Sequence, residues 1–178
     1  MRLILPAEFT AMPWQNGGGV THEIARADEA GRLVWRLSIA EVASDGPFSA
    51  FPGLSRVLTV IDGAGLILAM PSGELTALPL APVRFPGDVP VDCRRIAGPV
   101  RDFNLIFDAA RVAGDVTALT GPARRNGPVA ALLALTPGVF VSDGESDSAL
   151  PPGAVALDAA RVGLSSTARA LIVTLGPL

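Results

Sequence analysis

The sequence has no lysine and no tyrosine, and it has one cysteine and one histidine. Without lysine, Schiff-base chemistry and a lysine general base are excluded. The lone Cys93 excludes an intramolecular disulfide and a thiolate metal cluster. The lone His22 excludes, within one chain, a metal site built on two or three imidazoles. We therefore expect no metal and no other cofactor, and we name no catalytic residue.

Long hydrophobic runs are absent as well. No apolar stretch approaches the roughly 20 residues that cross a bilayer, and the apolar start of the chain is too short for the core of a signal peptide. The net charge is −3, and the arginines are scattered except at Arg94-Arg95 and Arg124-Arg125, which argues against a nucleic-acid surface. We expect a cytoplasmic protein that binds neither nucleic acid nor membrane.

Turn-forming residues are abundant. The chain has 19 glycines and 16 prolines, and short apolar or alternating runs lie between them. This spacing predicts an all-β sandwich or barrel. The evidence for helix is limited to residues 111–119 and 158–164, where a turn or two could form. The expected strands are residues 20–27, 33–42, 56–62, 66–70, 74–78, 89–96, 100–107, 129–135, 139–142, 154–157 and 169–175. Among these, residues 129–135 are too short for periodicity to decide between strand and helix.

We expect one compact unit over residues 1–178. A turn-rich segment at 121–128 leaves open a division into halves of about 1–120 and 121–178.

Residues 13–24 read Pro-Trp-Gln-Asn-Gly-Gly-Gly-Val-Thr-His-Glu-Ile. Three glycines before a strand are typical of an unusual backbone path or a close approach to a ligand, and a flexible loop is the plain alternative. Strand alternation places Thr21 and Glu23 on one face, toward a cavity or toward solvent. His22 and Ile24 share the other face, so we interpret His22 as a packed or edge residue. We interpret Cys93 as a small buried hydrophobe.

Two arginines are candidates for binding an anion. Arg56 enters an apolar strand, where a cation needs a partner. That partner is a structural carboxylate such as Glu23 or Glu41, or an anionic ligand, since guanidinium makes two parallel hydrogen bonds with a carboxylate. Arg36 is the second candidate, on the polar side of its strand. Asn104 lies inside a strand, where asparagine is disfavoured, so it either serves a pocket or holds a loop.

The motif at 13–24 resembles the HutD/Ves family. The resemblance extends to Trp-Arg-Leu-Ser-Ile-Ala-Glu-Val at 35–42, to Asp-Gly-Pro-Phe-Ser-Ala-Phe-Pro-Gly at 45–53 with Arg56, and to Gly-Pro-Val-Arg-Asp-Phe-Asn at 98–104. It covers about residues 10–107. Family members commonly have lysine where this chain has Gln15, so a cation is missing from the glycine motif.

The resemblance implies a cupin-like antiparallel jelly roll, doubled into a compact bicupin. It also implies a regulatory role in bacterial histidine utilisation, through binding of a carboxylate intermediate such as N-formylglutamate. The metal-binding cupin pattern needs several histidines, so we expect a metal-free site.

These observations predict a small-molecule site inside the barrel. Arg56 would pair with a ligand carboxylate, Arg36 would be the second cation, and Glu23 would hold an arginine or a ligand amide. Hydrogen bonds would come from Asn16, Thr21 and Asn104, and the walls from Trp14, Phe48 and Phe103.

Other hypotheses stay open. The same residues could form a polar network that only ties loops to the sheet. A metal-independent enzyme could use Glu23, Asp102 and Arg56 for proton transfer on a small carboxylate. A stress-related protein-interaction module is a third reading, and apolar edge strands would allow a homodimer.

Overall fold

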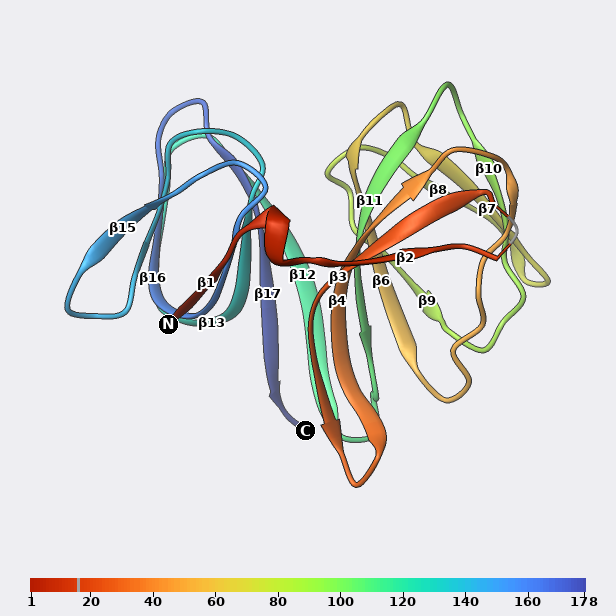
Figure 1. Ribbon diagram of the computed structural model, residues 1–178, viewed down its shortest axis with the longest axis horizontal. Coiled ribbons are helices and arrows are strands. Elements are labelled where there is room, and N and C mark those ends of the chain that lie inside the picture. The colour runs from red at the N-terminus through yellow and green to blue at the C-terminus, as the bar shows by residue number, and fades with distance from the viewer. Residues whose placement is uncertain (16) are drawn as a thin grey trace. The chain divides into compact units, whose positions relative to one another are not determined.

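A computed structural model describes residues 1–15 and 17–178 and is built almost entirely from β-strands (Figure 1). Its sheets are antiparallel, and one isolated parallel bridge joins Val60 and Pro79. Among the described residues the only helix is a 3-10 turn, η1 (Pro6–Glu8), and no helix is long and apolar enough to cross a membrane. The expected all-β antiparallel fold is confirmed.

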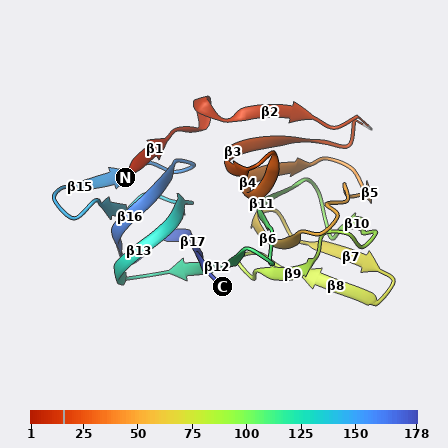
Figure 2. The same ribbon diagram turned by 90° about the horizontal axis from the view of Figure 1, so that it is seen from below.

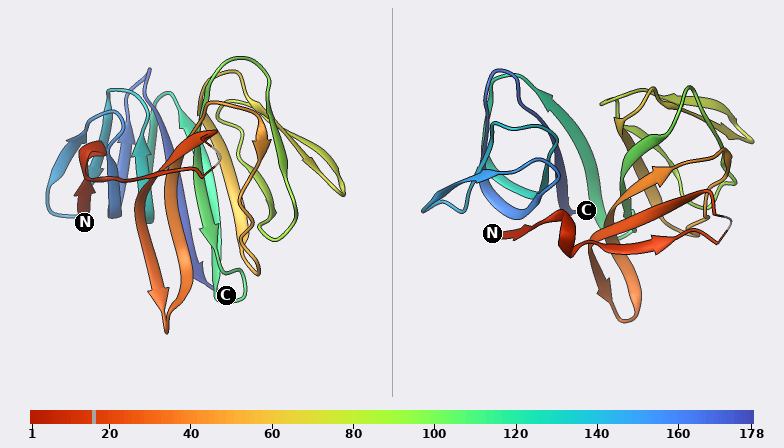
Figure 3. Two further views of the ribbon diagram at one scale, coloured as in Figure 1. Left: turned by 45° about the vertical axis from the view of Figure 1, so that its right-hand side comes forward. Right: turned by 45° about the horizontal axis from the view of Figure 1, so that its top comes forward.

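The chain forms two compact units, one of Met1–Phe9 with Ala113–Pro177 and one of Thr10–Val112 with Leu178. The first unit is a seven-stranded sheet, whose strands run side by side (green to blue in Figure 3, with the N-terminal β1 in red). Its order is β12 (Val112–Thr120), β17 (Arg169–Pro177), β13 (Ala123–Ala134), β16 (Val155–Leu164), β14 (Val139–Ser142) and β15 (Asp147–Leu150), with β1 (Arg2–Ile4) paired to β16.

Of the two segments expected to form short helical turns, 111–119 lies in β12 from Val112 onward and 158–164 lies in β16, so that expectation is wrong. Their alanines favour helix in isolation, but strand pairing and burial decide the conformation. Ala159 and Val162 of β16 are buried in the core of this unit. β13 likewise contains an apolar run that is buried between two neighbouring strands.

The second unit has a six-stranded and a four-stranded sheet (Figure 2). The first has the order β2 (Thr10–Pro13), β3 (Gly19–Glu29), β4 (Arg32–Val42), β11 (Val100–Phe107), β6 (Ser55–Asp62) and β9 (Val83–Pro86). The second has the order β5 (Gly46–Pro47), β10 (Asp92–Arg95), β7 (Leu66–Met70) and β8 (Gly73–Ala77). Both sheets contribute to one buried apolar cluster, for example through Leu58 and Leu68.

The longest hairpin of this unit joins β3 to β4 through a two-residue turn (Figure 1). Ala30 and Gly31 both have positive φ, at 49° and 73°. This is the backbone of the hairpin turns that match strand twist. A register shift between Glu23 and Ala25 adds a bulge to β3. The hairpin thereby fixes which side chains of β3 and β4 share a face.

Candidate ligand-binding site

The strand register gathers polar side chains on one face of the six-stranded sheet. Residues directly opposite each other in a sheet point to the same side. In β4, β11 and β6, one row across the sheet is Arg36, Ile106 and Arg56. The next row contains Ser38 and Asn104. The polar side of β4 expected from the sequence is therefore continuous with the polar positions of β11 and β6.

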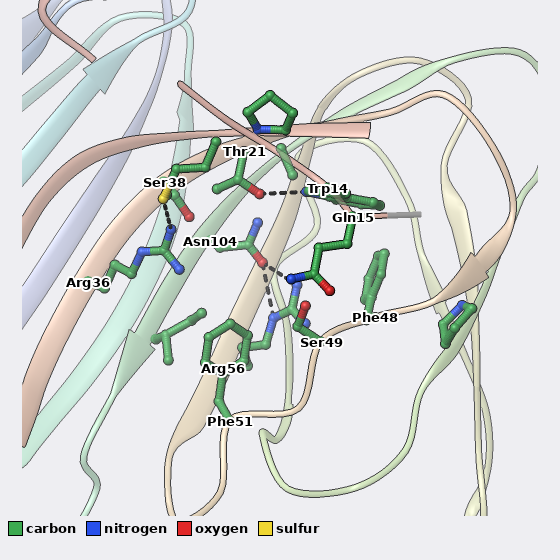
Figure 4. A pocket seen from close by; sticks show the side chains of 15 residues that line it. Trp14, Gln15, Thr21, Arg36, Ser38, Phe48, Ser49, Phe51, Arg56 and Asn104 are labelled. Carbon is green, nitrogen blue, oxygen red and sulfur yellow. Dashed lines mark hydrogen bonds between the residues drawn. The ribbon is translucent and has the colours of Figure 1, made fainter. Parts of the chain in front are cut away.

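A cavity of about 560 Å³ lies over these rows, within the second unit (Figure 4). Its volume is in the range of small-molecule sites. Its polar lining comes from Gln15, Thr21, Arg36, Ser38, Ser49, Arg56 and Asn104. Its apolar lining comes from Met12, Pro13, Trp14, Ala40, Pro47, Phe48, Phe51 and Ile106.

Arg56 lies at the centre of this arrangement and is only 7% exposed. Its Nε and Nη2 atoms donate hydrogen bonds to Oδ1 of Asn104, at 3.2 and 2.8 Å. Three aromatic rings surround the guanidinium carbon, at 4.8 Å for Phe48, 5.3 Å for Phe85 and 5.8 Å for Phe51. Desolvation lowers the pKa of Arg56 to about 10, so the group stays charged at neutral pH.

Asp102 lies behind Asn104 and is fully buried. Nδ2 of Asn104 donates to Oδ1 of Asp102 at 2.6 Å, while its own Oδ1 accepts from Arg56. The amide thus connects a buried cation with a buried carboxylate. Desolvation raises the pKa of Asp102 to about 6, and the Arg56 charge and the Asn104 hydrogen bond oppose that rise.

Trp14 is held over the cavity by a hydrogen bond and a ring contact. Its Nε1 donates to Oγ1 of Thr21 at 2.8 Å, and its ring meets Phe48 edge-on with the centroids 6.2 Å apart. The glycines that follow Trp14 allow the backbone to place its ring over the cavity. Gly17 has a φ of 70°, and a Cβ at Gly19 would collide with the carbonyl oxygen of Glu41 and lie 3.2 Å from the Trp14 ring. At Gly17 and Gly19 the backbone of the motif therefore has a defined conformation rather than that of a flexible loop.

Arg36 carries the second positive charge of the cavity lining. Its Nε lies 2.7 Å from Oε2 of Glu23, and its Nη2 lies 3.9 Å from the sulfur of Met12. Glu23 also lies 3.9 Å from Arg26. Glu23 therefore pairs with Arg36 and does not itself line the cavity.

The structure brings together most of the residues predicted for the site. Those that line the cavity are Trp14, Thr21, Arg36, Phe48, Arg56 and Asn104. Phe103 does not line it, because strand alternation turns it to the opposite face of β11 from Asn104, where it is 1% exposed. Asn16 lies outside the described residues. Neither Glu23 nor Glu41 is the partner of Arg56, since Glu23 pairs with Arg36 and Glu41 lies 3.2 Å from His22.

Other lining residues were not predicted for the site, and their signals were weak. Gln15 lies in the motif at 13–24, Ser49 and Phe51 lie in the motif at 45–53, and Ser38 lies on the same face of β4 as Arg36. Met12 and Ile106 carry no sequence signal of a site, because apolar residues in strands are typical of any core.

Cys93 is buried, and desolvation raises the pKa of its thiol to about 12, as suits a core residue. The residues that the structure describes contain no cluster of three or more histidine, cysteine, aspartate or glutamate side chains that could hold a metal ion.

Comparisons with known proteins give a family match over most of the chain. The family model HutD matches residues 6–171. A Pseudomonas putida protein, described as an uncharacterized 21.2 kDa protein in the hutC 3′ region, is 38% identical over 129 residues, which are 70% of this chain and 67% of that protein.

Two solved structures resemble nearly the whole chain. A conserved protein of unknown function from Pseudomonas aeruginosa PAO1 matches with a TM-score of 0.86 and 31% identity, over 98% of this chain and 97% of that chain. HutD from Pseudomonas fluorescens SBW25, in a formate condition, matches with a TM-score of 0.80 and 32% identity, over 98% of both chains. The cupin-like fold expected from the sequence is confirmed.

Proposed function

The chain belongs to the HutD family, which is associated with histidine-utilisation loci, and we propose from this that it binds a small carboxylate intermediate of that pathway and regulates the pathway without converting the ligand. N-formylglutamate is the proposed ligand. The binding site is the cavity over β4, β6 and β11, and the site needs no metal.

The observation that carries this proposal is the buried guanidinium of Arg56 in the cavity wall. A guanidinium has five N–H donors, and Oδ1 of Asn104 accepts from only two of its nitrogens. Among the described residues, no other side chain or carbonyl accepts from Arg56. Donors of a nearly buried cation favour an acceptor that also carries negative charge, and a carboxylate matches their planar geometry.

The charge of the cavity lining supports an anion as well. Arg36 and Arg56 both line the cavity, and the Arg36 charge contributes to the lowered pKa of Arg56. The described lining residues include no aspartate and no glutamate. A ligand with two carboxylates and an amide-like group can place one carboxylate at each arginine. Gln15, Ser38 and Ser49 then provide partners for its polar remainder.

The chemistry of the lining favours binding over acid–base catalysis. The enzyme hypothesis needs Glu23 or Asp102 in contact with the ligand, but Glu23 lies beyond Arg36 and Asp102 lies behind Asn104. The described lining residues include no histidine, carboxylate or cysteine. A protein that binds an intermediate and leaves it intact can report its concentration, which is what regulation of a pathway requires.

A thermal-shift titration with N-formylglutamate, urocanate, histidine and glutamate tests the proposal. We expect N-formylglutamate to raise the melting temperature most, because it can place one carboxylate at each arginine and its amide-like group at the polar lining. A ligand at about 100 times its Kd adds roughly 2.7 kcal/mol of stability. Arg56→Gln should abolish this shift.

Arg94→Gln is the matched control. Arg94 is an exposed arginine of the same unit that pairs with Glu74 and does not line the cavity. The control should respond to ligand like the wild-type protein. If no ligand shifts the melting temperature, or if the shift survives Arg56→Gln, the proposal is wrong.

A further inference from the structure

Asp102 is a fully buried carboxylate that the proposed binding mode does not use. It does not line the cavity, and it reaches the cavity only through the amide of Asn104. One of its oxygens, Oδ2, has no hydrogen-bond partner among the described residues. A buried carboxylate oxygen without a partner is costly while the group is charged and costs less once a proton sits on it.

The charge that keeps Asp102 ionised is Arg56. The Arg56 guanidinium on β6 favours the carboxylate, and the Asn104 amide on its own strand does the same. Across from them, Cys93 on β10 is uncharged because the pKa of its thiol is raised to about 12. Arg36 on β4 acts on Arg56 but is itself paired with Glu23. Asp102 and Arg56 are therefore each other's main counter-charge inside the unit.

We propose that Asp102 is the resident counterion of Arg56 and that a bound anion replaces it in this role, so that binding is coupled to the uptake of a proton at Asp102. The inference rests on the proposed function of the cavity. The anion neutralises Arg56 and adds a negative charge nearby, and both effects disfavour the carboxylate form of Asp102. The proton comes from solvent and bonds to Oδ2, and no covalent bond of the ligand changes.

The coupling fixes the sign of the pH dependence. In the free protein the pKa of Asp102 is about 6, so the group is mostly ionised at pH 7 to 8. Binding moves this pKa upward, so the affinity for the anion rises as the pH falls through the interval between the free and bound values. The gain in affinity is about tenfold for each unit by which the pKa rises on binding.

The test is titration calorimetry of N-formylglutamate at pH 7 in two buffers with different ionisation enthalpies, followed by Kd measurements from pH 5.5 to 8. A His22→Gln background leaves the protein without an imidazole, the side chain most often responsible for pH dependence near neutrality. We expect net proton uptake, of up to one proton per ligand, and tighter binding at pH 6 than at pH 8.

Asp102→Asn in the same background should bind more tightly than its parent at pH 8 and lose the pH dependence. Asp45→Asn is the matched control, since Asp45 is an exposed carboxylate that pairs with Arg95 outside the cavity.

Binding without proton uptake by protein that retains Asp102 overturns this inference alone, and that result needs no Asp102 variant to fold. Weaker binding by Asp102→Asn at every pH also overturns it, because Asp102 would then only orient Asn104. Absence of binding at every pH overturns the proposed function and this inference together.

Discussion

Arg56 keeps its charge although it is almost entirely withdrawn from water. The solvent it gives up is replaced by Oδ1 of Asn104 and by the faces of Phe48, Phe51 and Phe85. Each favourable cation–π contact contributes roughly 0.5–2 kcal/mol, which offsets part of the cost of burying the cation. The guanidinium is therefore fixed in place before any ligand arrives. A fixed cation loses little entropy when an anion binds.

Also at the scale of single residues, Gly19 stabilises the fold because its lack of a side chain allows close packing around it. Because a Cβ there would collide with the backbone oxygen of Glu41 and press on the Trp14 ring, we expect Gly19→Ala to lower the free energy of unfolding by about 1–3 kcal/mol. Urea denaturation measures this. Gly176→Ala is the control, because a Cβ at Gly176 would meet no heavy atom within 4 Å and the φ of this residue is ordinary. Equal stability of the two variants would show that the close approach at Gly19 is unimportant.

At the scale of elements, strand alternation turns Phe103 and Asn104 of β11 to opposite faces of the sheet. Phe103 packs on one face, and Asn104 faces the cavity on the other. We expect Phe103→Leu to lower the free energy of unfolding by about 1–3 kcal/mol while the Kd for N-formylglutamate stays unchanged.

Asn104→Ala should instead raise that Kd by more than about tenfold, because it removes the two hydrogen bonds that hold the Arg56 guanidinium in place for the ligand. Hydrogen bonds to charged groups contribute roughly 1.5–3 kcal/mol. Urea denaturation and calorimetry on both variants separate the two effects. A raised Kd in Phe103→Leu, or an unchanged Kd in Asn104→Ala, would contradict this division of β11.

Much of the cavity was predictable because strand alternation and residue chemistry act locally. Arg36 and Ser38 share a face of β4 because side chains two residues apart in a strand point to the same side. Arg56 enters an apolar strand, and a buried cation needs a partner wherever it lies in the fold. The identity of that partner was not predictable, because it depends on the register of β11 against β6. Phe103 was misplaced although strand alternation alone puts it on the face of β11 opposite Asn104. The helical expectation for 158–164 failed because burial in a sheet overrides the helix preference of alanine.

At the scale of the whole molecule, a net charge of −3 coexists with a cavity lined by two arginines. The lining residues all come from the unit formed by Thr10–Val112. The carboxylates that face Arg36 and Arg56, Glu23 and Asp102 respectively, do not line the cavity. An anion in the cavity therefore meets the guanidinium groups first, and salt screens this attraction. The proposed ligand contacts therefore all come from one of the two units.

Hydrogen exchange can test this confinement, because amides in surface turns exchange through local openings rather than global unfolding. The amides of Phe48 and Phe51 donate to the carbonyls of Val91 and Gly87, and their side chains line the cavity. Saturating N-formylglutamate should slow exchange at these two amides. The amides of Glu145 and Ser146, which donate to the Asp143 carboxylate in the other unit, should exchange at unchanged rates. With Arg56→Gln and the same ligand, the exchange rates of all four amides should stay unchanged. Equal slowing at both pairs of amides in the wild-type protein would show that the ligand does not act through this cavity alone.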